Sequence, residues 1–144
     1  MSYPRPENFF LVRFLVVGAG RVGKTSIINR FVDKEFKEQT KTEKFVEYLS
    51  RYAYMNDNKD FIKALILNVP CLDISIHNNN GFRVCIAGCI YIFDLSDRTS
   101  IDEIRIWNEN LDFPRPKFPL FRRFMVGHQK SKWLNRQISY EEAS

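Results

Sequence analysis

Apolar runs alternate along this chain with stretches whose apolar positions recur at helical spacing. The first run, Phe14–Val17, predicts a strand buried on both faces, because it presents no polar side chain to water. After a glycine-rich loop, the apolar residues gather on one side of a helical spiral, which predicts an amphipathic helix. Its apolar face contains Ile27, Ile28, Phe31 and Val32, and its polar face contains Asn29, Arg30, Asp33 and Lys34.

The middle of the chain predicts a β-hairpin. Phe45–Tyr54 is rich in aromatic side chains and is typical of a strand with one exposed face, while Phe61–Val69 predicts a strand with a buried run. The polar segment Met55–Lys59 between them predicts a turn. Beyond the hairpin, Ile74–Ile76 is ambiguous, and Asn78–Gly81 has the composition of a loop.

The alternation resumes in the second half of the chain. Cys89–Phe93 predicts a buried strand that ends at Asp94, and Phe121–Val126 predicts a further strand. Between them, Ser100–Glu103 has the pattern of a capping box, which predicts that a helix begins there and that the prolines from Pro114 onward end it. The apolar stripe of this helix comprises Ile101, Ile104, Trp107 or Asn108, and Leu111.

Strands that alternate with helices predict an α/β fold. We expect a mainly parallel sheet, helices on both faces, and any ligand at the carboxyl ends of the strands. A second capping box, Ser139–Glu142, lies just before the last residue, so we expect either a truncated product or a fold whose last elements, a strand and a helix in the family described below, are lacking. The chain of 144 residues corresponds to one domain, residues 10–144, after an N-terminal tail, residues 1–9.

The loop after the first strand carries the phosphate-loop pattern G-x-x-x-x-G-K-[ST] at Gly18–Thr25. Glycines allow a tight turn that points backbone N–H groups inward, and the following helix adds its positive end. Lys24 brings a cation to the outer phosphates, and the hydroxyl of Thr25 is a ligand for Mg²⁺. A chance Lys-Thr pair behind a glycine turn is the alternative, and the flanking strand and helix weigh against it. The predicted phosphate-binding residues are Gly20, Arg21, Val22, Gly23, Lys24, Thr25 and Ser26.

Composition and charge narrow the function classes. A hydrophobic content of 44% indicates a globular protein, and a net charge of +5 is modest and spread out. The cations between Arg115 and Arg136 accompany no regular nucleic-acid motif, so a solvated basic face is favoured over nucleic-acid binding. Met1–Asn8 contains no apolar run, so we expect no signal peptide and a cytoplasmic protein.

The three cysteines are an odd number among apolar neighbours. Cys71, Cys85 and Cys89 therefore predict reduced core thiols rather than a disulfide framework. A zinc site with His77 is the alternative, but the spacing matches no regular zinc pattern.

These segments together resemble the Ras superfamily of small GTPases, most closely its Rab branch. The resemblance is specific at Gly18–Thr25 and its continuation to Phe31, and it is weaker at Tyr91–Asp97 and Arg136–Ala143. It implies a Ras-like sheet, GTP and GDP as ligands, and Mg²⁺ as cofactor. It also implies protein effectors or regulators as partners and a switch role in membrane traffic.

The segments that correspond to the family's two switches depart from its pattern. Glu43 stands where the family has a threonine that closes on Mg²⁺ and the terminal phosphate, with Thr42 one residue away. The family motif Asp-x-x-Gly-Gln corresponds here to Asn68, Cys71 and Leu72. The acid behind the metal, the glycine that senses the third phosphate and the glutamine that orients water are thus all replaced.

The guanine-reading motif departs as well. Where the family has Asn-Lys-x-Asp, this chain has His128, Gln129, Lys130 and Ser131, so the carboxylate that pairs with the base is missing. These replacements predict a Rab-like GTP-binding protein with impaired or no hydrolysis and weak selectivity for guanine. The alternative is a pseudo-GTPase module that binds protein partners without a nucleotide switch. Whether the chain is an enzyme stays open.

Membrane attachment is expected to depend on partners. Rab relatives attach through prenylated cysteines at the C-terminus, whereas this chain ends in Glu141–Ser144. We therefore expect no self-contained membrane anchor, and recruitment to vesicles only through another protein.

Overall fold

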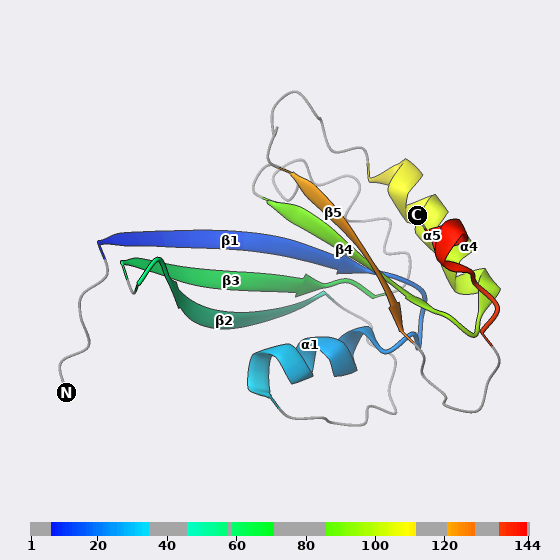
Figure 1. The fold of residues 1–144 in the computed structure, drawn as a ribbon, viewed down its shortest axis with the longest axis horizontal. Helices are drawn as coiled ribbons and strands as arrows, with labels where there is room; N and C mark the ends of the chain where they lie inside the picture. The colour runs from blue at the N-terminus through cyan, green and yellow to red at the C-terminus, as the bar shows by residue number, and fades with distance from the viewer. Residues whose placement is uncertain are drawn as a thin grey trace.

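The computed structural model describes residues 7–34, 46–57, 59–70, 86–111, 121–128 and 136–143. Within these ranges, five strands and three helices follow one another along the chain (Figure 1). Their bounds are β1 Asn8–Val17, α1 Lys24–Asp33, β2 Glu47–Met55, β3 Asp60–Asn68, β4 Gly88–Asp94, α4 Arg98–Asn110, β5 Arg122–His128 and α5 Tyr140–Ala143.

The five strands form one sheet in the order β2-β3-β1-β4-β5. β1 pairs in parallel with β3 and β4, and β4 pairs in parallel with β5. β2 runs antiparallel to β3, after a turn in which Asn56 and Asp57 have positive φ. The predictions of a mainly parallel α/β sheet and of a hairpin in the middle of the chain are confirmed, and this hairpin forms one edge of the sheet.

Side-chain alternation along β1 divides the core into two clusters. Leu15 and Val17 belong to the cluster on the α4 side, where Trp107 is fully buried. Val16 belongs to the cluster on the α1 side, together with Ile28. The two helices thus cover opposite faces of the sheet, as Figure 1 shows, and the prediction of helices on both faces is confirmed.

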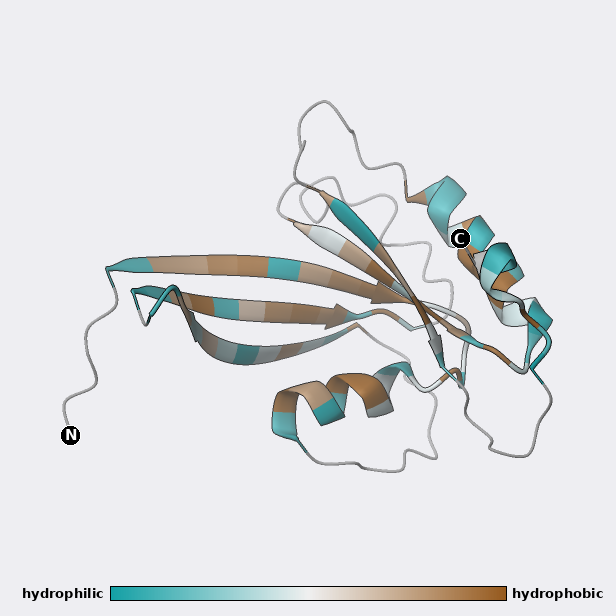
Figure 2. Cartoon of the chain, viewed as in Figure 1, coloured by the Kyte–Doolittle hydropathy of each residue, from teal (hydrophilic) through white to brown (hydrophobic). Residues whose placement is uncertain are grey.

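β1 begins earlier than predicted, at Asn8 instead of Phe14. The reason is its parallel pairing with β3, which runs from Asn8 opposite Asp60 along the whole length of both strands. This half of β1, with β2 and β3, extends past α1 in Figure 1, and Figure 2 shows hydrophobic residues continuing along it. Phe9 is 60% exposed and Tyr52 is 53% exposed on this extension, so β2 has the exposed aromatic face that its sequence predicts.

α4 begins at Arg98, so the predicted start at Ser100 is wrong. Asp97 caps the helix instead, because its side chain accepts a hydrogen bond of 3.0 Å from the backbone N–H of Thr99. Ser100 is fully buried, and its hydroxyl accepts a hydrogen bond of 3.0 Å from the backbone N–H of Asp94. Ser100 therefore ties the helix to the end of β4 rather than capping it.

The apolar stripes of the two long helices are largely as predicted. In α4, Trp107 faces the core, whereas Asn108 accepts a hydrogen bond from the hydroxyl of Tyr91. In α1, two positions differ from the prediction. Phe31 is 46% exposed, with the guanidinium of Arg51 4.8 Å from its ring centroid, and Asn29, expected on the polar face, is buried.

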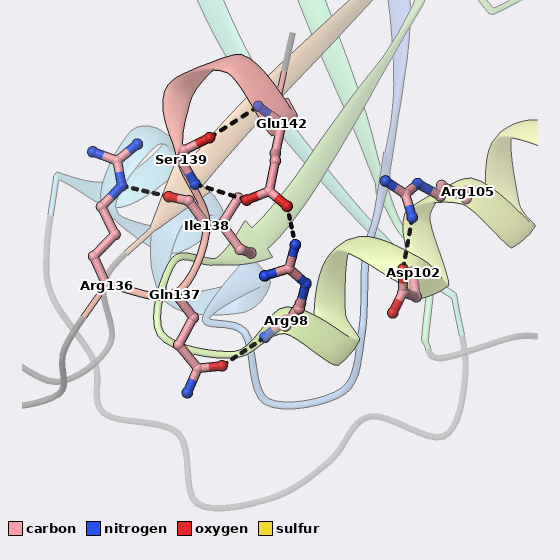
Figure 3. A network of polar contacts seen from close by, with 8 residues as sticks. All are labelled: Arg98, Asp102, Arg105, Arg136, Gln137, Ile138, Ser139 and Glu142. Atoms are coloured by element: carbon pink, nitrogen blue, oxygen red, sulfur yellow. Dashed lines mark hydrogen bonds and ion pairs between the residues drawn. The ribbon is translucent and has the colours of Figure 1, made fainter.

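The segment before α5 packs against the start of α4 (Figure 3). Ile138 is buried in the cluster on the α4 side, and its backbone N–H donates to the carbonyl of Leu95. Ser139 and Glu142 form the predicted capping box, because the backbone N–H of each donates to the side chain of the other, at 3.1 and 3.2 Å. Arg98 of α4 forms an ion pair with Glu142 across this junction.

Cys89 lies in β4 as a buried free thiol, as predicted for a core cysteine. Burial raises its pKa from 9.0 to about 12, so the thiol is neutral at physiological pH. Cys71, Cys85 and His77 lie outside the described residues. Among the described residues, no helix has the length and apolar character needed to cross a bilayer.

We expect Ile104→Ala to lower the free energy of unfolding by about 2–5 kcal/mol, because it leaves a cavity between α4 and the sheet. Ile104 is 4% exposed. Ile106, on the same helix, is 44% exposed, so Ile106→Ala is a matched control that we expect to change stability by about 0.5 kcal/mol. Urea denaturation measures both values. Equal losses in the two variants would show that α4 does not pack as described.

Candidate phosphate-binding site

The loop between β1 and α1 lies at the carboxyl end of a strand in the middle of the sheet. Gly18 passes so close to β4 that a Cβ there would lie less than 3.0 Å from the carbonyl oxygen of Ile92. Gly23, the N-cap of α1, has a φ of 92°, in the left-handed region that glycine adopts without strain. The turn therefore requires glycine at both positions, and it brings the positive end of α1 to the end of β1.

Lys24 is buried beneath this loop. Its ammonium donates hydrogen bonds to the carbonyl oxygens of Gly18, at 3.0 Å, and Ala19, at 2.8 Å, and the residue is 7% exposed. The cation is therefore already held against the turn. Gly20 and Arg21 are exposed at the tip of the turn, so this part of the backbone is open to an incoming anion.

The other predicted loop residues support this arrangement. Val22 is buried at 2% exposure in the cluster on the α1 side, which anchors the loop to the core. The backbone N–H of Ile27 donates to the carbonyl of Gly23 at 3.0 Å and so forms the first turn of the helix. Ser26 is half-buried beside Thr25 in the same turn.

Thr25 is the predicted Mg²⁺ ligand, and its hydroxyl is connected to the end of β3. Asn68 donates a hydrogen bond of 2.9 Å from Nδ2 to Thr25 Oγ1. The same nitrogen lies 3.3 Å from Oε2 of Glu47, at the start of β2. Hydroxyl, amide and carboxylate oxygens are the ligand types that Mg²⁺ prefers, so the chemistry of these residues fits this ion. The described residues contain no cluster of three or more His, Cys, Asp or Glu side chains that could hold a metal.

The family model described as "Ras family" matches residues 13–144. This chain belongs to the Ras family. The confirmed fold class is therefore that of a Ras-family α/β domain, and the chain resembles its Rab-related members.

Three Rab-related proteins share 25–29% sequence identity with this chain. Ras-related protein RABA6a of Arabidopsis thaliana is 26% identical over 137 residues, which cover 94% of this chain and 57% of the relative. Ras-related protein Rab-7b of Mus musculus is 29% identical over 116 residues, covering 74% and 52%. Ras-related protein Rab-4 of Dictyostelium discoideum is 25% identical over 145 residues, covering 96% and 65%. The chain thus spans between about half and two thirds of the length of these relatives.

The segment that corresponds to the family's guanine-reading motif is described only at its first residue. His128, the last residue of β5, lies against the phosphate loop, with Nδ1 3.2 Å from the carbonyl oxygen of Val22. A Cβ on Gly23 would lie 3.1 Å from the His128 ring, so the glycine also makes room for this contact. Gln129, Lys130 and Ser131 lie outside the described residues, as do Thr42, Glu43, Cys71 and Leu72.

Glu47 is a site residue that the sequence analysis missed. It lies directly opposite Asn68 in the pairing of β2 with β3. The register of the hairpin identifies this residue, because the turn and strand lengths determine which residue lies opposite Asn68. The observed pairing of Met55 with Asp60 leads by this count to Glu47, whereas the predicted turn at Met55–Lys59 would place Val46 opposite Asn68.

We expect Gly18→Ala to destabilise the protein by several kcal/mol, because the new methyl group collides with a backbone carbonyl of β4 that cannot move aside. Gly20→Ala is the matched control, since a Cβ there meets nothing within 4 Å. Thermal unfolding in the absence of nucleotide measures both. Similar melting temperatures for the two variants would contradict the close approach of β1 to β4.

Proposed function

We propose that this chain binds GDP and GTP through Gly18–Thr25, with Mg²⁺ at Thr25, and hydrolyses GTP slowly or not at all. The resemblance to the Rab branch implies a role in intracellular membrane traffic, exercised through protein effectors or regulators. We further propose that the protein acts in the cytoplasm and reaches vesicles through such partners. The observation that carries the proposal is the buried Lys24 ammonium, held by Gly18 and Ala19 beneath a loop that is open at its tip.

Preorganisation is the reason that this observation favours binding. A buried cation that is already in place does not pay the entropy of ordering when an anion arrives. The N-terminus of α1 adds a partial positive charge at the same place. Phosphate contacts of this kind do not depend on the base, so they support binding of a nucleoside diphosphate even where base reading is weak.

Asn68 supports the proposal of impaired hydrolysis. The corresponding carboxylate of the family would accept a hydrogen bond from the threonine hydroxyl, whereas Asn68 donates one to it. The hydroxyl oxygen thus has one lone pair engaged, and the neutral amide brings no charge. Mg²⁺, when bound, would neutralise phosphate charge, so the loss of the carboxylate at this position disfavours phosphoryl transfer unless another residue replaces its charge. The replacements at Cys71 and Leu72, known from the sequence, also favour impaired hydrolysis.

One observation favours the alternative of a pseudo-GTPase interaction module. Phe61 lies at the centre of an aromatic group on the extension of β1, β2 and β3, with ring centroids of Phe9, Tyr52 and Tyr54 at 5.8, 5.5 and 4.8 Å. Exposed aromatic side chains of this kind are common in protein interfaces. Partner binding through this surface does not require nucleotide hydrolysis. A chain that binds partners equally well with and without GDP would match this alternative.

We expect Lys24→Ala to lower the affinity for GDP by at least about 100-fold, because charge-assisted hydrogen bonds to phosphate are lost. Titration of a fluorescent GDP analogue measures the affinity. Arg105→Ala is the charge-matched control, since Arg105 lies exposed on α4 and pairs only with Asp102 among the contacts shown in Figure 3. Equal affinities of the wild type and Lys24→Ala would rule out binding through this loop.

We expect GDP and ADP to compete within about tenfold of each other, a difference of about 1.4 kcal/mol. Ser131 stands where the family has the acid that accepts from the guanine edge, and a hydroxyl makes a weaker, uncharged contact. Displacement of the fluorescent analogue by each nucleotide measures the ratio. A preference for GDP of several thousandfold would mean that other residues read the base.

A further inference from the structure

The pairing of β2 with β3 brings a carboxylate next to the residue that replaces the family's metal-site acid. Glu47 and Asn68 are direct partners on the two antiparallel strands. Direct partners project their side chains from the same face of a sheet, so both point toward the same side. Asn68 is fully buried and Glu47 is half-buried, which places the carboxylate at the margin of the site.

A continuous set of polar contacts joins this carboxylate to the predicted Mg²⁺ ligand. Asn68 Nδ2 lies 2.9 Å from Thr25 Oγ1 and 3.3 Å from Glu47 Oε2. An amide nitrogen carries two hydrogens, so Asn68 can donate to both oxygens at once. A carboxylate only accepts hydrogen bonds, and Glu47 therefore keeps the nitrogen of the amide, rather than its oxygen, turned toward this side.

The charge of this set of contacts resides on Glu47. Thr25 and Asn68 are neutral, and both are at most 8% exposed. A charge at the edge of such a buried site is screened less than one in bulk water. A divalent cation at the Thr25 hydroxyl would therefore be attracted by the Glu47 carboxylate even without direct contact.

We propose that Glu47 supplies, from the neighbouring strand, the negative charge of the Mg²⁺ site that Asn68 does not. The inference rests on the proposed nucleotide binding and adds to it a residue that supports the metal. Glu47 is a positioning residue: it orients the Asn68 amide, and its charge raises the affinity of the nucleotide complex for the cation. A Glu47 that only stabilises the hairpin would leave that affinity unchanged.

The test compares GDP affinity in EDTA with GDP affinity in Mg²⁺, the ratio being the gain due to the metal. Glu47→Gln is nearly isosteric and keeps an oxygen that accepts from Asn68, so it removes charge alone. We expect it to reduce the gain by about tenfold, the effect of one charge on a divalent ion a few ångströms beyond hydrogen-bond distance. Glu109→Gln, on the exposed side of α4, is the charge-matched control and should leave the gain unchanged.

A second variant separates charge from structure. The double variant Glu47→Gln with Asn68→Asp has its carboxylate at position 68 on β3 instead of position 47 on β2. We expect it to restore the gain in GDP affinity due to the metal. Electron paramagnetic resonance of Mn²⁺ with the GDP complexes provides a direct readout of metal binding, with the same order expected among the variants. Thermal melts establish that each variant is folded, and Glu47→Ala is measured in parallel.

Each result decides a different point. A wild-type gain retained in Glu47→Gln and Glu47→Ala would overturn the inference while leaving nucleotide binding in place. A loss that Asn68→Asp does not restore would also overturn it, since Glu47 would then serve structure alone. No binding of GDP by the wild type in either buffer would overturn the proposed function, and this inference with it.

Discussion

The close approach of β1 to β4 at Gly18 is the constraint on which the site depends. Because no Cβ fits between this residue and the Ile92 carbonyl, the chain can turn immediately at the end of the strand. This sharp turn places Lys24 under the carbonyls of Gly18 and Ala19, and α1 therefore begins at the end of the sheet. The packing of β1 against β4 and the position of the Lys24 ammonium therefore depend on the same close approach.

The site was predictable where its determinants are local. The glycine turn between β1 and α1 and the capping box at Ser139 each depend on residues within a few positions of one another, and both form as their patterns indicate. The hairpin also forms, although Met55 belongs to β2 and not to the turn. Non-local contacts were not predictable in the same way. β1 begins at Asn8 because β3 pairs with it. The Ser100 hydroxyl accepts a hydrogen bond from Asp94 at the end of β4 instead of capping its own helix. In each case a tertiary partner outweighed the local propensity.

The same distinction explains what was missed in the site. Asn68 was recognised as a replacement because it stands where the family motif Asp-x-x-Gly-Gln has its acid, but its partner Glu47 lies in another strand, 21 residues away. His128 corresponds to the first residue of the family's base-reading motif, and the contacts described for its side chain are with the phosphate loop. Composition and periodicity describe each element alone, and these contacts arise only where two elements meet.

The contact between His128 and Val22 joins the outermost strand of one side of the sheet to the phosphate loop. β5 is bonded to β4 and exposes Phe124, Met125 and Val126, while its last residue touches the loop that follows β1. Binding equilibria that share such a contact obey reciprocity. If a molecule bound to β5 displaces His128 and thereby changes the affinity of the loop for an anion, then an anion in the loop changes the affinity of β5 for that molecule by the same factor.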